Sequence, residues 1–306
     1  MDTYVIVGAG PVGTETAQLL RDRGDRVVVV SRSGSGPVID GIEPITADAS
    51  DADALAEITD GATALFNCAN PRNYTQWAAV WPPLAGSLLN AAEQTGATLV
   101  TASSLYGYGP VDGPMLEGMP DAATDQKGKI RAGMWAEAKA RHDAGRLRAV
   151  EVRASDYVGA RVGANGHITR HLPTAKHGKA AWVIGDPDLP HSWTDVRDVG
   201  RTLVAVATQA DTWGQVWHAP SNPARSQRAA LTDVLAAAGK SPVAVRAIPR
   251  AIMALGGAVS PLVRELNDMA YVFRRPYVVS AQQTQDHLGL APTPWAEVCR
   301  RTAEGN

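Results

Sequence analysis

The sequence predicts an α/β fold in which a doubly wound parallel sheet is followed by a smaller C-terminal lobe. Short runs rich in β-branched residues alternate with longer helical stretches up to about residue 158. Such alternation is typical of a parallel sheet whose strands are joined by crossover helices. Beyond residue 158 the sequence becomes rich in Gly and His and then helical with interspersed prolines, which indicates a second, smaller unit.

Six strands and four helices are expected in the first half. The run at residues 26–30 is nearly all valine without alternation, as in a strand buried on both faces. The stretch at 51–59 has acidic residues in its first turn, where they suit a helix dipole. The expected strands are 4–7, 26–30, 42–47, 63–67, 98–102 and 148–152, and the expected helices are 13–24, 51–59, 77–94 and 130–144.

The second half divides into a lobe and a segment that returns to the sheet. We expect residues 1–158, joined by 192–220, to form the main domain, and residues 159–191 and 221–306 to form the lobe. The expected strands there are 181–184 and 215–218, and the expected helices are 198–208, 228–238, 249–255 and 261–274.

Composition and charge exclude several classes of protein. Hydrophobic residues make up 45% of the 306 residues, enough for a substantial core. The 29 basic and 31 acidic residues nearly balance, which argues against a nucleic-acid surface. Two cysteines are too few for a disulfide scaffold or a four-cysteine zinc site. No run approaches the ~20 apolar residues of a membrane helix, and the start lacks the features of a signal peptide. We therefore expect a cytoplasmic protein with no membrane partner.

A glycine-rich turn follows the first expected strand. Residues Gly8, Gly10 and Gly13 form a G-x-G-x-x-G run, with Pro11 and Val12 between the second and third glycines. Gly8 allows the tight turn, Gly10 lets the backbone approach a pyrophosphate, and Gly13 lets the helix pack close to the strand. Because the run lies between a strand and a helix, it predicts a Rossmann-type dinucleotide site with the phosphates at the helix start.

The end of the second strand indicates which dinucleotide binds. It reads Ser31-Arg32-Ser33, without the acidic residue that bonds the ribose of NAD. An arginine forks onto a 2′-phosphate and stacks on adenine, so we predict NADP(H); an exposed surface role for Arg32 stays open. Asp48, after the third strand, is expected at the adenine amino group, and Ala69 and Asn70, after the fourth, beneath the cofactor.

Four segments together resemble a known family. Residues 99–109 include Ser103-Ser104-Leu105-Tyr106-Gly107-Tyr108-Gly109 and resemble the S-S-x-x-V-Y-G segment of the extended short-chain dehydrogenase/reductases, the group of NAD-dependent epimerases and dehydratases. Pro114, Glu117 and Pro120 are similar to its P-x-x-E-x-x-P loop, residues 153–159 to R-P-x-N-V-Y-G, and residues 193–199 to F-x-x-V-x-D-V. The resemblance covers about residues 3–220 and implies that Ala154 and Ser155 lie at the cofactor.

The resemblance implies a catalytic serine, Ser104, that bonds the substrate oxygen. The family then has Y-x-x-x-K, where Tyr is the proton donor, but no Tyr lies between Tyr108 and Tyr157 here. The preferred alignment puts Lys127 in place of Tyr and Arg131 in place of Lys; an alternative places Trp135 and Lys139 there. Burial and the like charge of Arg131 would favour proton loss from Lys127.

Tyr106 is a second candidate donor, because in an extended segment it would point to the same side as Ser104.

Two functions remain open. One is an NADP(H)-dependent oxidoreductase that reduces or epimerises a small carbonyl compound with this altered site. The other is a non-catalytic NADP(H)-binding regulator or scaffold, which the missing Tyr favours. By resemblance alone, a homodimer is also expected.

Several other residues have plainer interpretations. His167, His171 and His177 have no acidic or cysteine partner at a recognisable spacing, so no metal site is expected. His191 is a weak candidate for the cleft. The remaining conspicuous residues are expected to be packed or solvated: Trp77 and Trp81 in the core or a subunit interface, Cys68 and Cys299 as small apolar groups, and Arg274 and Arg275 in a charged turn, with anion binding as the less favoured alternative.

Overall fold

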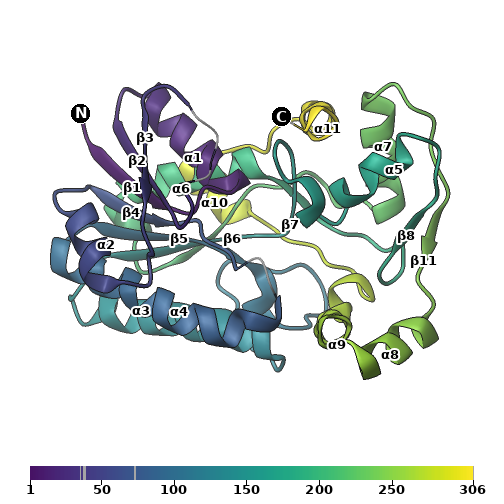
Figure 1. Cartoon of the computed structure of the whole chain (residues 1–306), viewed down its shortest axis with the longest axis horizontal. Helices are drawn as coiled ribbons and strands as arrows, with labels where there is room; N and C mark the ends of the chain where they lie inside the picture. Colours follow the sequence, from purple (N-terminus) through teal and green to yellow (C-terminus); the bar gives the residue numbers. More distant parts are fainter. Residues whose placement is uncertain (35, 37–38, 72–73, 306) are drawn as a thin grey trace.

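The structure, a computed structural model, describes residues 1–34, 36, 39–71 and 74–305. Its centre is a seven-stranded sheet in which every neighbouring pair is parallel (Figure 1). The strand order is β10-β6-β5-β4-β1-β2-β3. The strands are β1 (Thr3–Val7), β2 (Arg26–Ser31), β3 (Ile42–Thr46), β4 (Ala64–Asn67), β5 (Thr98–Ser104), β6 (Ala149–Ala154) and β10 (Val216–His218).

Helices cover both faces of this sheet, so the predicted doubly wound fold is confirmed. Helices α1 (Pro11–Asp22) and α6 (Val196–Ala207) pack together on one face. Helices α2 (Ala52–Thr59), α3 (Trp77–Thr95) and α4 (Gln126–Asp143) cover the other. The strand order reverses between β1 and β4, and such a reversal opens a crevice at the carboxyl ends of the strands.

Helix α4 begins four residues earlier than the sequence pattern predicted. The carboxylate of Asp125 caps it by accepting a hydrogen bond from the N–H of Gly128 at 2.8 Å. An N-cap aspartate satisfies one of the donors that a helix start leaves open. The cap brings Lys127 into the first helical turn rather than into a loop.

The lobe is built from short elements around a separate apolar core. The predicted helix at 261–274 is two elements, because helix α9 ends at Asp268 and a 3-10 turn follows. Three strands of three residues, β7 (Asp156–Val158), β9 (Trp193–Asp195) and β11 (Val245–Ala247), escaped prediction, because they are too short to show a period. Strand β7 pairs with β9 at the two points where the chain passes between the main domain and the lobe. The lobe itself contains β8 (Ala181–Val183) paired with β11, and α5 (Leu172–Ala175), α7 (Gln227–Ala237), α8 (Arg250–Val259) and α9 (Pro261–Asp268).

The last part of the chain contacts both units. Helix α10 (Gln282–Leu288) lies against β10, with the rings of His287 and Trp217 5.1 Å apart. Helix α11 (Trp295–Glu304) packs on α7, and its Arg301 lies 3.0 Å from the carboxylate of Glu15 on α1.

The 3-10 helices are η1 (Tyr74–Gln76), η2 (Leu105–Tyr108), η3 (Gly163–Asn165), η4 (Thr169–His171), η5 (Ala210–Thr212) and η6 (Ala270–Phe273). Among the described residues, none of the helices is long and apolar enough to cross a membrane.

His218, the last residue of β10, joins the sheet to two other segments. Its Nδ1 lies 2.7 Å from the carbonyl of Ser280, which can only accept, so Nδ1 donates and Nε2 accepts from the Tyr108 hydroxyl, also at 2.7 Å. Burial, together with the nearby charge of Arg153, lowers the pKa of His218 to about 4 despite the hydrogen bond to Ser280.

This buried histidine predicts acid sensitivity. In the unfolded chain this imidazole binds a proton near pH 6.5, but in the folded chain only near pH 4. The contribution of neutral His218 to stability is therefore fully present above pH 6.5 and is lost as the pH falls toward 4. We expect His218→Gln to flatten the slope of unfolding free energy against pH in this window by up to about 1.4 kcal/mol per pH unit. Urea unfolding at several pH values measures it. The exposed His177→Gln is the control, and equal slopes in His218→Gln and wild type would contradict the assignment.

Candidate functional site

The three glycines of the first turn occupy different surroundings. Gly8 has φ +110°, and a Cβ there would lie 2.7 Å from the carbonyl carbon of Cys68. A Cβ on Gly13 would lie 1.9 Å from the carbonyl oxygen of Gly8. A Cβ on Gly10 would meet no atom within 4 Å. Gly8 and Gly13 are therefore required by packing, whereas Gly10 borders open space at the start of α1.

The start of α1 presents backbone donors to that space. Gly10 is its N-cap and provides no side-chain oxygen, and Pro11 is the first helical residue. The N–H groups of Val12 and Gly13 lie in the first turn, where a helix has no acceptors of its own. Together with the positive end of the helix dipole, they suit an anionic phosphate group.

The turn after β2 lies beside the glycine turn. A Cβ on Gly36 would stand 3.0 Å from the Cβ of Ala9. Ser31 ends β2, and Arg32 and Ser33 follow on the surface. Asp48 accepts hydrogen bonds from the N–H and hydroxyl of Ser50, and these bonds, with the charge of Arg32, hold the pKa of Asp48 below its ordinary value.

The ends of β4 and β6 complete this edge of the sheet. After β4, the N–H of Ala69 donates to the Asn67 side chain at 3.3 Å, and the exposed Asn70 accepts from Arg131 at 3.2 Å. Ala154 ends β6 opposite Ser104 of β5. The next residue, Ser155, donates its N–H to the Thr194 hydroxyl at 3.2 Å.

Three serine hydroxyls lie buried at this edge of the sheet. The Oγ atoms of Ser103, Ser104 and Ser155 are buried and have no hydrogen-bond partner among the described residues. A buried hydroxyl without a partner costs about 1–3 kcal/mol of stability. Proteins retain such groups mainly where a ligand or water completes them, so the carboxyl edge of β5 and β6 is the polar part of the candidate site.

Lys127, in the first turn of α4, forms an ion pair with a residue of the lobe. Its side chain is buried, and Nζ contacts the carboxylate of Glu265 on α9. The first turn of α4 packs on η2, because a Cβ on Gly128 would lie 2.5 Å from the carbonyl of Tyr106. The sequence argument considered burial and Arg131 alone, and nothing in the sequence pointed to a carboxylate 138 residues away.

The rest of α4 favours this alignment over the alternative. Lys139 lies at the surface, where it pairs with Asp143 at 2.6 Å, and Trp135 packs toward the core on the α3 side of the sheet. Neither faces the carboxyl edge of β5. Lys127 and Arg131 are therefore the better match to the two catalytic positions of the resembled family.

Arg131 is held by aromatic rings. Its guanidinium lies 4.3 Å from the ring centroid of Trp81 and 5.0 Å from that of Trp77. Both tryptophans are buried in the core beneath the sheet, which excludes the subunit-interface alternative for them. Cation–π contacts of this kind fix the orientation of the guanidinium, which also bonds Asn70 of the predicted cofactor site.

The expectation for Tyr106 was wrong in its geometry. Leu105–Tyr108 forms a 3-10 helix, not an extended segment, so the two-residue alternation does not place Tyr106 on the same side as Ser104. The ring of Tyr106 instead lies 6.5 Å from that of Trp77. Tyr108 is structural, because it bonds His218 and lies under the guanidinium of Arg153.

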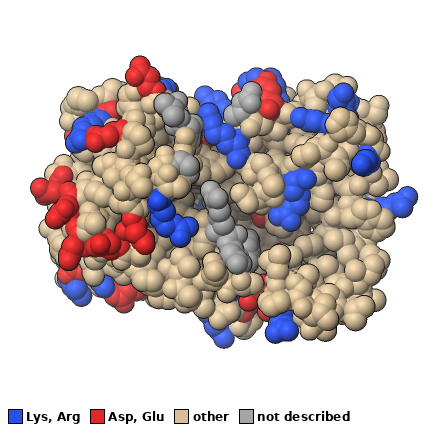
Figure 2. Space-filling view, in the orientation of Figure 1, with Lys and Arg blue, Asp and Glu red and all other residues tan. Residues whose placement is uncertain are grey.

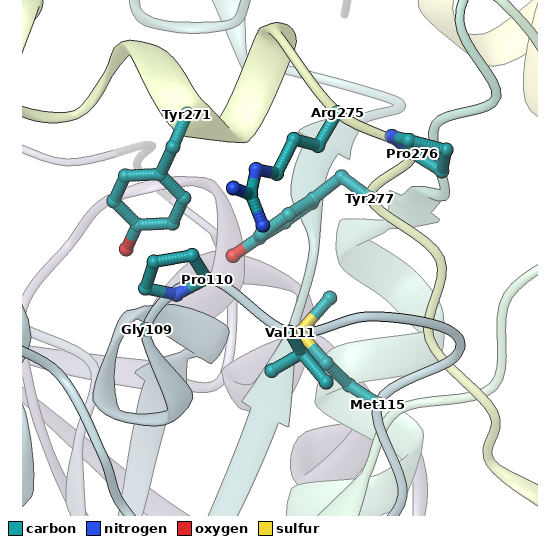
Figure 3. Close-up of a pocket in the computed structure, with 8 residues that line it drawn as sticks. All are labelled: Gly109, Pro110, Val111, Met115, Tyr271, Arg275, Pro276 and Tyr277. Atoms are coloured by element: carbon teal, nitrogen blue, oxygen red, sulfur yellow. The ribbon is translucent and has the colours of Figure 1, made fainter.

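A small pocket opens between the loop after η2 and the lobe (Figure 3). The hydroxyl of Tyr277 points toward Tyr271 and Pro110, and Arg275 reaches over them. This hydroxyl is buried and has no hydrogen-bond partner among the described residues. Tyr271 donates to Asp125, the cap of α4, at 3.4 Å. The pocket is lined by Gly109, Pro110, Val111, Met115, Tyr271, Arg275, Pro276 and Tyr277.

His167 and His191 form a buried structural cluster around Asp156. His191 Nε2 lies 2.8 Å from Asp156, and His167 lies 3.6 Å from it. His191 is only 2% exposed and stacks on Phe273, so the suggestion that it faces the cleft was wrong. Burial lowers the pKa of His167 to about 4, despite the charge of Asp156. Within the described part of the chain, no group of three or more His, Cys, Asp or Glu side chains is placed to hold a metal ion.

Charge is distributed unevenly over the visible face of the molecule. Figure 2 shows basic side chains flanking the boundary between the sheet and the lobe, whereas acidic side chains gather at the far end over α2.

The two cysteines offer no nucleophile here, because burial raises the pKa of Cys68 and of Cys299 to about 12.

Comparisons with known proteins agree with this geometry. The sequence model described as the NAD dependent epimerase/dehydratase family matches residues 4–218. No curated protein matches the chain significantly in sequence.

Solved structures with the same fold span nearly the whole chain. A dTDP-glucose 4,6-dehydratase from Bacillus anthracis in complex with NAD is 15% identical, with a TM-score of 0.81 over 100% of this chain and 96% of that one. A UDP-glucose 4-epimerase from Thermotoga maritima with UDP-glucose is 16% identical, with a TM-score of 0.80 over 99% and 98%. A dTDP-glucose 4,6-dehydratase from Streptomyces venezuelae with NAD bound is 18% identical, with a TM-score of 0.79 over 99% and 96%. Since the family model covers more than half of the sequence, the chain belongs to the NAD dependent epimerase/dehydratase family.

Proposed function

We propose that this protein is an NADP(H)-dependent oxidoreductase that reduces or epimerises a carbonyl-bearing small molecule, with Lys127 as proton donor in place of the family's Tyr. The observation that carries the proposal is the buried hydroxyl of Ser104 at the carboxyl end of β5, for which the described residues offer no hydrogen-bond partner. It lies next to η2, on which the first turn of α4 packs with Lys127. A hydrogen-bond donor and a protonated amine near one another suit a substrate oxygen that gains negative charge.

The residues at the sheet edge fit a dinucleotide. The open space at Gly10 and the donors of Val12 and Gly13 suit a pyrophosphate. Ser31, Arg32, Ser33 and Asp48 would hold the adenosine end, and Ala69, Asn70, Ala154 and Ser155 the nicotinamide end. Solved structures of this fold hold NAD. NADP(H) is our proposal here, because Arg32 follows β2 where an acid would select NAD.

The side chains would divide the chemistry as follows. When bound, the cofactor supplies or accepts a hydride. The Ser104 hydroxyl donates a hydrogen bond to the substrate oxygen and orients the carbonyl carbon. Lys127 Nζ gives its proton to that oxygen during reduction and takes it back during oxidation. Arg131, held between Trp81 and Asn70, adds positive charge beside the nicotinamide end of the site.

The second candidate is a non-catalytic NADP(H)-binding regulator or scaffold. The contact of Lys127 with Glu265 favours it, because the amine is already engaged by the protein. Transient kinetics with NADPH and a panel of aldehydes and ketones separates the two. Cofactor binding without hydride transfer to any compound, together with no effect of Ser104→Ala on binding, would favour the regulator.

Cofactor binding should be sensitive to Gly10 in particular. Gly10 has φ −78°, which alanine adopts readily, and its Cβ would stand in open space, so Gly10→Ala should fold normally. The methyl group would occupy the proposed pyrophosphate position, and we expect NADPH affinity to fall at least about tenfold, or roughly 1.4 kcal/mol. Fluorescence titration measures it. Gly86→Ala on α3, also in open space, is the control, and unchanged affinity in Gly10→Ala would contradict the site.

Arg32 should determine the choice of cofactor. We expect Arg32→Asp to weaken NADPH binding at least about tenfold and to improve NADH binding, because the carboxylate accepts from a ribose hydroxyl but repels a 2′-phosphate. Calorimetric titration of both reduced cofactors measures the ratio. Arg23→Asp, at the far end of α1, is the control for the change of charge. A preference for NADPH that survives in Arg32→Asp would overturn the assignment.

The proton donor should be identified by three substitutions. Ser104→Ala and Lys127→Met are each expected to lower kcat roughly 10²-fold or more with little change in NADPH affinity, since general acid catalysis and oxygen orientation contribute on that scale. Tyr106→Phe should have little effect, because Tyr106 lies in a 3-10 helix and its ring packs near that of Trp77. NADPH oxidation with the best compound of the panel measures it. A large loss in Tyr106→Phe and none in Lys127→Met would reassign the donor.

A further inference from the structure

We propose that Glu265 of the lobe is the positioning residue of Lys127, so that the proton-donor site is complete only when α9 lies against α4. This inference rests on the function proposed above. The pair joins a residue of the main domain to one of the lobe, 138 positions apart in the sequence. Lys127 occupies the place of the family's Tyr, so a carboxylate from the lobe acts directly on the altered part of the site.

The contact is direct and largely shielded from water. Nζ of Lys127 bonds Oε2 of Glu265, and the Lys127 side chain is 3% exposed, against 23% for Glu265. Burying an ammonium without an opposite charge is costly, and Arg131 one helical turn away adds a like charge on the same helix. The Glu265 carboxylate supplies that opposite charge and fixes the position of the Lys127 amine.

Each partner is fixed by its own surroundings. On one side, Asp125 caps α4 and accepts from Tyr271 of η6. On the other, α9 is tied to α8 by the side chain of Asn267, which donates to the carbonyl of Met253 at 2.8 Å. Helix α9 also contacts η1, after β4. In the part of the chain that the structure describes, the charged and titratable groups near the pair include Asp125, Arg131, Tyr106 and Tyr271.

The charges at this pair are the reverse of those in the Y-x-x-x-K of the resembled family. Here a carboxylate from the lobe, rather than a lysine of the same helix, lies beside the residue at the Tyr position. In reduction, a hydride from the reduced cofactor reaches the carbonyl carbon, the C=O π bond breaks, and Lys127 gives its proton to the oxygen. This yields an alcohol, oxidised cofactor and a neutral amine. A proton from water then restores the ammonium beside Glu265.

The first test needs neither cofactor nor substrate. The apoprotein is treated at pH 7 with a water-soluble N-hydroxysuccinimidyl acetate, and acetylation of Lys127 is followed by peptide mass spectrometry. We expect Glu265→Gln to raise the acetylation rate of Lys127 severalfold, because more of the amine is neutral. Asp268→Asn, the same change at an exposed site on the same helix, is the matched control. Near-wild-type thermal unfolding of both variants shows that α9 still folds, and wild-type labelling in Glu265→Gln would overturn the proposal.

The second test separates positioning from a merely structural contact. With NADPH and an active carbonyl compound, Glu265→Gln should lower kcat roughly tenfold with KM changed less than about twofold. The alkaline limb of its pH profile should move to lower pH, and Glu265→Asp should recover part of the rate. If the pH profile is unshifted and KM and thermal stability change instead, the contact has only a structural role and the proposal is overturned. If wild type turns over no compound, the proposed function fails, and the acetylation test still decides the pairing.

Discussion

The carboxyl edge of the parallel sheet determines where chemistry can occur in this protein. Parallel strands all end on the same side, so the loops after β1, β2, β4, β5 and β6 converge there whatever their sequences. The glycine turn, Arg32, Asn70, Ser104 and Ser155 come from separate parts of the chain and meet only for this reason. Helix α4 then brings Lys127 to the same edge, because its first turn packs on the segment that follows Ser104.

Sequence reasoning worked well where local patterns determine the structure. The glycine run, the valine-rich strand and the helical stretches fixed the main sheet to within a few residues, because each depends on contacts between neighbours in the sequence. It did less well where tertiary contacts decide. The 3-10 turn at Tyr106 and the early start of α4 at its Asp125 cap each changed the place of a candidate catalytic side chain.

The residues that sequence reasoning missed lie in the lobe. Glu265, Tyr271 and Tyr277 have no motif around them, and they reach the site only because η6 and α9 fold back toward α4. His191 shows the converse error, since a histidine beside a family motif is buried against Phe273 and Asp156. A single sequence carries little information about pairs so far apart, and short elements such as β7 and β9 leave no period to detect.

Among the described residues, ionic contacts connect the lobe to the main domain at several places, and two of them involve largely buried side chains. Arg301 of α11 lies between Glu15 of α1 and Asp195, which caps α6. Burial raises the pKa of Asp195 to about 6, although the Arg197 N–H and Arg301 oppose it. Lys127 of α4 and Glu265 of α9 form the second contact. Buried pairs of this kind add little stability over apolar packing. They require a defined geometry, however, because a buried charge without its partner is costly. Such contacts define where the lobe sits on the sheet, and one of the two joins α9 of the lobe to Lys127 in the first turn of α4. With Lys127 as the proton donor that we propose, the lobe would contribute to the reactive centre itself as well as to the cover over it.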